Sequence, residues 1–164
     1  MLRTRTVALL FAAALACTGP RQPSPPTPSV SVGMPYPPLP PGYLHEGGFL
    51  VGQGPGITYS LSTVRTPSGL NIWLGRFTHH DSLGKAHWQL RAIAPIPALP
   101  SGYSVATMDC SLDGRADSGV FAIGQWVADS LVDVRHAWVA LTEVERLDTV
   151  PLNRVSCSYD GDRD

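Results

Sequence analysis

Residues 72–88 read IWLGRFTHHDSLGKAHW, and residues 121–138 read FAIGQWVADSLVDVRHAW. Each stretch has a short apolar run that ends in glycine, then Asp-Ser-Leu, and then a tryptophan, in the same order. The pattern Cys-Ser-x-Asp-Gly follows each copy, first at Cys110 and again at Cys157. We interpret these matches as a weak internal duplication with a period of about 48 residues, within the range of common repeat units.

Each copy is predicted to consist of β-strands. The run from Ile72 to Phe77 is short and apolar, as in a buried strand. His87 to Ile93 and Tyr103 to Cys110 alternate between apolar and polar residues, as in strands with one buried face. The fold class that we expect is therefore all-β, either a β-sandwich or a compact barrel.

The sequence leaves two alternative architectures open. Repeats of this length are also typical of propeller blades, but two copies cannot close a ring, so propeller-like blades would have to close by oligomerisation. Residues 126–147 contain neither glycine nor proline and place apolar residues at helical spacing, and a helix there would give an α+β fold. The first copy has a turn with Gly84 at the corresponding place, which favours strands.

The first residues have the pattern of an export signal. Arg3 and Arg5 precede the apolar run Val7 to Ala16, which is too short to cross a bilayer as a helix. Residues 1–16 are therefore predicted to be a signal peptide. Ala14-Leu15-Ala16-Cys17 is similar to the lipobox of bacterial lipoproteins, in which the cysteine becomes the lipidated first residue of the mature protein.

This resemblance implies a lipid anchor on Cys17, with acyl chains such as palmitate, in the cell envelope. Thr18 follows the cysteine in place of Asp, and in such lipoproteins this implies sorting to the outer membrane. The alternative is a soluble periplasmic or secreted protein that is cleaved near Ala16. With Cys17 lipidated, Cys110 and Cys157 are left at equivalent repeat positions, and we expect them to form a disulfide, because exported proteins meet oxidising conditions.

Residues 17–43 are predicted to form a tether between the anchor and a folded β domain at residues 44–164. The stretch 18–42 holds ten of the 16 prolines in the chain. Because proline lacks a backbone donor and has a fixed φ, it cannot join a helix interior or the middle of a sheet. An extended spacer is the conformation that this composition favours.

The charge balance excludes a nucleic-acid partner held by a basic surface. The chain has 164 residues, with 12 Lys and Arg against 13 Asp and Glu, and Lys85 is its single lysine. No apolar run approaches the roughly 20 residues that a transmembrane helix needs. The expected contact with the membrane is therefore the lipid anchor.

The densest polar cluster is Thr78 to Asp81 together with His87. If Ser82 to Lys85 form the turn of a hairpin, His80 lies opposite His87 on one face, near enough to share a metal ion. No third ligand follows at a recognised spacing, so we expect neither a metal nor another cofactor. A metal-dependent hydrolase built on His79, His80 and His87 is one alternative function.

The tryptophans suggest a different alternative. An exposed indole can stack on a sugar ring, which would make the protein a carbohydrate-binding module, whereas a buried one packs in the core. No catalytic motif is recognised, so the function that we expect is a non-catalytic binding or structural module of the envelope, in contact with another protein or a cell-wall polymer. The four tryptophans are Trp73, Trp88, Trp126 and Trp138.

Overall fold

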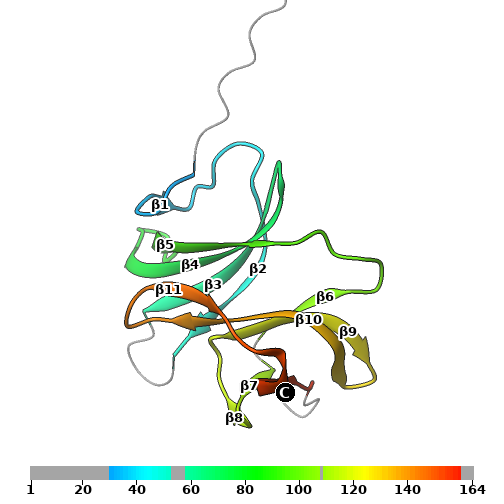
Figure 1. Ribbon diagram of the computed structural model, residues 1–164. Coiled ribbons are helices and arrows are strands. Elements are labelled where there is room, and N and C mark those ends of the chain that lie inside the picture. The colour runs from blue at the N-terminus through cyan, green and yellow to red at the C-terminus, as the bar shows by residue number, and fades with distance from the viewer. Residues whose placement is uncertain (1–29, 53–57, 108, 160–164) are drawn as a thin grey trace, which may run out of the picture.

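The computed structural model describes residues 30–52, 58–107 and 109–159, and these form layers of antiparallel strands (Figure 1). The first layer, sheet A, consists of β1 (Pro35–Tyr36), β2 (Leu44–Val51), β3 (Tyr59–Thr66), β4 (Gly69–His80) and β5 (Ala86–Ile96). Its strand order is β1-β5-β4-β3-β2, so the first apolar run of the duplication lies in the central strand.

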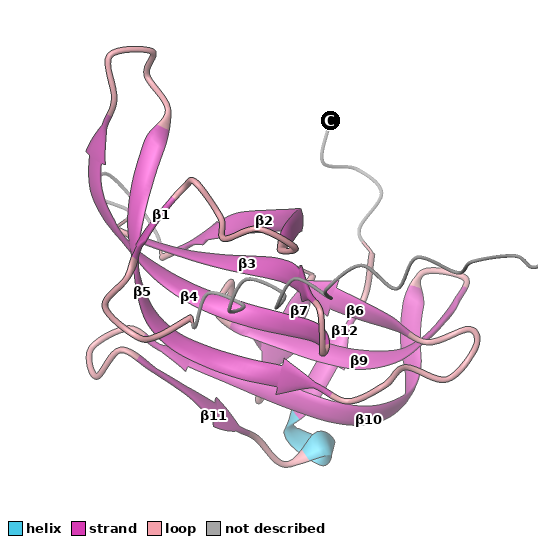
Figure 2. Ribbon diagram, turned by 90° about the horizontal axis from the view of Figure 1, so that it is seen from above, coloured by secondary structure: helices cyan, strands magenta, loops and turns pink. Residues whose placement is uncertain are grey.

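The second layer, sheet B, has the strand order β11-β10-β9-β6. It consists of β6 (Ser104–Thr107), β9 (Val120–Val127), β10 (Ser130–Leu141) and β11 (Arg146–Thr149). A small third sheet, sheet C, has the order β12-β7-β8 and consists of β7 (Cys110–Leu112), β8 (Arg115–Ala116) and β12 (Val155–Cys157). The 3-10 turn η1 (Leu152–Arg154) precedes β12 and is the one helical segment coloured in Figure 2.

The main core lies between sheets A and B. Ile72 and Leu74 of β4 point into it from one side, and Phe121 and Ile123 of β9 from the other. Trp138 of β10 stacks on Phe121 with 5.2 Å between the ring centroids. Because two sheets pack face to face and none of those in the described part of the chain closes into a barrel, the predicted all-β fold is confirmed as a sandwich.

The alternative of a helix over residues 126–147 is wrong, because this stretch ends β9 and forms β10 and β11. Both faces of β10 are covered: Trp138 and Ala140 face the main core, while Ala137 and Val139 face a second apolar cluster. Consecutive apolar residues therefore replace the alternation of a half-exposed strand. Ala128 supplies the positive φ, 49°, of the tight turn between β9 and β10.

The two copies of the duplicated pattern form corresponding hairpins. Ile72 to Gly75 lie in β4, which pairs with β5, and Phe121 to Gly124 lie in β9, which pairs with β10. The matched tryptophans differ, however, because Trp138 points into the main core while Trp88 packs on the outer face of sheet A.

The outer face of sheet A is covered by residues 30–43, which the composition assigns to the tether. Tyr36 is buried against Trp73, with ring centroids 5.4 Å apart, in a cluster that also contains Val64 and Leu90. The backbone joins as well: Gly33 N–H donates to the Leu90 carbonyl, and β1 pairs with β5 at the sheet edge. The packed part of the chain therefore includes residues 30–43, which precede Leu44, where the composition changes. A proline-rich segment can do this because an edge strand needs few donors.

Sheet C covers the opposite outer face, that of sheet B. Cys110 and Cys157 are direct partners in the β7–β12 pair, with 4.0 Å between their Cα atoms, and they form the disulfide expected from the sequence. Both cysteines are buried against Val120, Ala122 and Val139. The disulfide thus connects the end of the chain to the middle, across a loop of 47 residues.

The predicted signal peptide (1–16), Cys17 and the tether up to residue 29 lie outside the described residues. Within the described part, no helix is long and apolar enough to cross a membrane.

Candidate functional site

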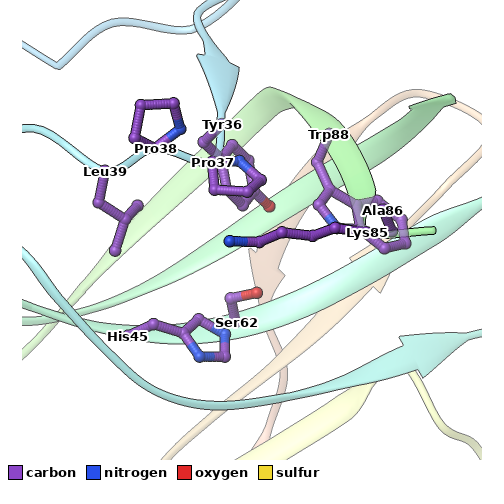
Figure 3. Close-up of a pocket in the computed structure, with 9 residues that line it drawn as sticks. All are labelled: Tyr36, Pro37, Pro38, Leu39, His45, Ser62, Lys85, Ala86 and Trp88. Carbon is purple, nitrogen blue, oxygen red and sulfur yellow. The ribbon is translucent and has the colours of Figure 1, made fainter. Parts of the chain in front are cut away.

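A cavity of about 430 Å³ opens between the covering N-terminal segment and sheet A. A shallower extension of about 210 Å³ shares His45, Ser62 and Trp88 with it and continues over β2. We call the two together the Trp88 groove (Figure 3). The main cavity is lined by Tyr36, Pro37, Pro38, Leu39, His45, Ser62, Lys85, Ala86 and Trp88.

Trp88 forms one wall of the groove. It lies opposite Tyr36 of β1 and opposite Phe77 of β4 in the strand register. The Phe77 ring contacts the indole edge to face, with 5.6 Å between the ring centroids, so the neighbouring strand supports the Trp88 side chain. The indole is half-buried, with the remainder of its surface turned to the groove.

Serines of β3 form the floor of the groove. Ser60 and Ser62 alternate along the strand, so both hydroxyls point to the outer face of the sheet, where both residues are buried. Gly48 of β2 leaves room beside them: a Cβ there would lie 3.1 Å from Ser62 Oγ and 3.2 Å from His45 Nε2. A bulge in β2 between His45 and Gly47 brings the exposed imidazole to the same side.

The Tyr36 hydroxyl enters the sheet surface above Gly75. A Cβ at Gly75 would lie 2.1 Å from Tyr36 Oη and 3.1 Å from Ser60 Oγ, so only glycine admits the phenol here. Tyr36 Oη and Ser60 Oγ are buried and form no hydrogen bond of good geometry with any described residue. Burial raises the pKa of Tyr36 above its usual value of 10.0, and the nearby Ser60 and Ser62 hydroxyls offset part of that shift.

Lys85 crosses the open side of the groove. In Figure 3 its side chain runs between Tyr36 and Ser62 toward His45. Its backbone is fixed by Asp81, whose Oδ1 accepts hydrogen bonds from the N–H groups of Leu83 and Lys85, each at 2.9 Å. Both bonds stabilise the carboxylate and hold the pKa of Asp81 below its usual value of 3.8. The bond from the Lys85 N–H has the larger effect.

The predicted pairing of His80 with His87 is wrong. Asp81 N–H donates to the Lys85 carbonyl, so the turn is one residue shorter than expected and the register moves by one residue. The bulge between Phe77 and His79 lies farther from the turn and does not affect this pairing. His79 is the partner of His87, and their rings stack at 4.7 Å. His80 lies opposite Ala86, on the other face of the hairpin, so His80 and His87 cannot share a metal ion.

Asp81 is the other group near the histidine pair, with its Oδ2 at 3.3 Å from His87 Nε2. Among the residues that the structure describes, no three His, Cys, Asp or Glu side chains are arranged to hold a metal ion. The three histidines of the hydrolase hypothesis are therefore divided between two faces rather than gathered in one site.

The four tryptophans separate into two kinds. Trp73 is fully buried and Trp138 is 8% exposed, and both belong to the core. Trp126 is half-buried beside the second apolar cluster, over sheet B. Trp88 alone of the four lines the groove.

Several groove residues were not singled out from the sequence. Tyr36 lies in a stretch that composition assigns to a tether, and His45 and Ser62 carry no motif. The one available signal was Lys85, as the single lysine in the chain and the last residue of the predicted turn.

No family model, curated protein or solved structure matches this chain. The chemistry of the groove must therefore be judged from its own side chains. It offers a flat indole, a hydroxyl, an imidazole and an ammonium group around one cavity. Ser62 and His45 lie on the same side of the groove, and no hydrogen bond between the two side chains is found among the described residues.

Proposed function

We propose that this protein is a non-catalytic carbohydrate-binding module of the bacterial cell envelope, which is anchored in the outer membrane by a lipid on Cys17. The observation that carries the binding function is the Trp88 groove. A half-buried indole forms its wall, and hydrogen-bonding groups from Ser62, His45 and Lys85 surround the same cavity. A sugar has an apolar face that stacks on an aromatic ring and hydroxyls that require hydrogen-bonding partners around its rim.

The location rests on the N-terminal sequence. The basic residues, the apolar run and the lipobox-like Ala14 to Cys17 support export and lipidation, and the Cys110–Cys157 disulfide is consistent with an oxidising compartment. Polymers of the cell wall or surface are the carbohydrates present there, so the partner that we propose is an envelope polysaccharide rather than a free sugar.

The binding function is tested by tryptophan fluorescence of the full mature protein during titration with oligosaccharides of envelope polymers. We expect the emission to shift on binding, because ligand replaces water against Trp88. Trp88→Ala is expected to abolish binding measured by calorimetry. Trp126→Ala is the matched control, since it removes another half-buried indole, over sheet B, and is expected to leave binding unchanged. Equal loss in both variants would contradict the proposal.

The anchor is tested separately by the intact mass of protein extracted from membranes. A mass that begins at Cys17 with an acyl adduct is expected, and Cys17→Ser is expected to release the protein in soluble form. A lipid-free mass would support the soluble periplasmic or secreted alternative instead.

A further inference from the structure

We infer that the Trp88 groove selects an acidic carbohydrate, in which a sugar ring packs on Trp88 while its carboxylate pairs with the Lys85 ammonium group. This inference rests on the proposed carbohydrate-binding function and specifies the class of sugar. It follows from an imbalance of charge in the groove.

The lining of the groove contains a lysine and a histidine but no aspartate or glutamate. Lys85 also forms no ion pair within the described part of the chain. The arginines differ: Arg65, Arg76, Arg91, Arg135, Arg146 and Arg154 each have a carboxylate partner. Arg115 is the other described cation without a partner, and it lies in sheet C.

The nearest carboxylate in the sequence is turned away from the Lys85 ammonium group. Asp81 Oδ1 accepts the backbone N–H groups of Leu83 and Lys85, and its Oδ2 faces His87, which lies on the other side of the strand from Trp88. Asp81 therefore fixes where Lys85 begins without neutralising its side chain. A positive charge left at a cavity mouth attracts an anionic group of the ligand.

The sequence that precedes the covering segment supplies no carboxylate for this charge. Residues 18–29 precede the covering segment and carry Arg21 but no acidic residue. An external ligand is thus the occupant that complements the groove.

The indole and the ammonium group are arranged for one sugar residue. Lys85 directly precedes β5 and Trp88 is its third residue, and Figure 3 shows the lysine side chain extending from near the indole across the cavity. Pro37 and Pro38 form the opposite apolar wall. A uronate combines a flat ring face with a carboxylate on its edge, so it can satisfy both groups at once.

Paired probes test the inference: oligogalacturonate and oligoalginate, each compared with its methyl ester. Esterification removes the charge and keeps the sugar rings. We expect the full mature protein to bind at least one acid about tenfold more tightly than its ester, as for the loss of one charge-assisted contact. Lys85→Gln is expected to remove this difference and Lys85→Arg to retain it. Arg115→Gln is the control, because it removes an unpaired cation from the other side of the molecule.

Acetylation of Lys85 gives an independent measurement, because it is the only lysine. A bound acid is expected to protect it from an amine-directed reagent, as read by peptide mass, whereas the ester is not. If acid and ester bind equally and Trp88→Ala abolishes both, the charge inference is wrong and the carbohydrate-binding proposal stands. If no probe binds, or if Trp88→Ala has no effect on binding, both are wrong.

Discussion

The two outer faces of the sandwich are covered in different ways. Residues 30–43 lie over sheet A through side-chain packing and a few backbone hydrogen bonds. Sheet C lies over sheet B and is closed by the Cys110–Cys157 disulfide. Both covers bury apolar residues, and the non-covalent one also leaves a cavity of about 430 Å³ between itself and sheet A. The groove that we propose as the carbohydrate site thus lies on the side without the disulfide.

The largest effect is expected from the covalent side. Replacing Cys110 and Cys157 together by serine should lower the free energy of unfolding by about 3 to 4 kcal/mol, because the chain loses the constraint on a loop of 47 residues. Urea unfolding measures the loss. The folded fraction should still bind ligand in the Trp88 groove. A loss of groove binding in folded protein would mean that the two faces are coupled.

A smaller loss of stability is expected from disturbing the non-covalent cover. Gly75→Ala places a Cβ 2.1 Å from Tyr36 Oη, so the Tyr36 ring must move away from the sheet. We expect a cost of about 2 kcal/mol, as for other overpacked sites. The same change made in a Tyr36→Phe background should cost less, because the colliding oxygen is absent. Equal costs in both backgrounds would show that Tyr36 is not what the alanine displaces.

Tyr36→Phe alone should change the free energy of unfolding by less than about 1 kcal/mol. The Tyr36 hydroxyl is buried without a hydrogen-bonding partner among the described residues. Its removal therefore breaks no hydrogen bond and removes a desolvation cost, while the ring contact with Trp73 is kept. Thermal unfolding of this variant beside the unaltered protein measures the difference. A large destabilisation would reveal a partner for this hydroxyl, such as a bound water.

The smallest effect is a local one at low pH. The carboxylate of Asp81 has a pKa below its usual 3.8, so its bonds to the turn are present above that value and are lost as pH falls through the lowered pKa. The amide signals of Leu83 and Lys85 should therefore titrate with a midpoint under 3.8 in nuclear magnetic resonance spectra. In Asp81→Asn these signals should lose this transition, while those of sheet B stay unchanged.

Local pattern was sufficient for the all-β class, although it left a sandwich and a barrel open, and the repeat positions of Cys110 and Cys157 indicated the disulfide. The apolar runs at Ile72 and Phe121 became central strands of the two sheets, since an apolar run bounded by turns needs burial on both faces. The same burial explains why a helix over residues 126–147 was a wrong alternative. Trp138, Val139 and Ala140 are apolar in succession because both faces of the strand are covered there. Two-sided burial removes the alternation by which a strand is usually recognised.

The site was harder to predict, because it depends on contacts between distant parts of the chain. The hairpin turn is one residue shorter than the expected Ser82 to Lys85, which changes which histidines face each other, and nothing in the local sequence indicates it. The groove itself exists because Tyr36 packs on strands that come later in the chain. A proline-rich composition predicts the backbone conformation of that segment but not the surface on which it lies.

The short strand β1 limits how the protein can be trimmed. It pairs with β5 at Trp88 and Gln89, and Gly33 and Met34 exchange backbone hydrogen bonds with Leu90 beside it. A chain cut at Leu44, where the composition changes, would leave the edge of an 11-residue strand unpaired next to a bare apolar face. Unprotected edges of this kind pair with other chains and aggregate. We therefore expect residues 30–43, which have the composition of a linker, to limit self-association. A recombinant domain should begin no later than Val30.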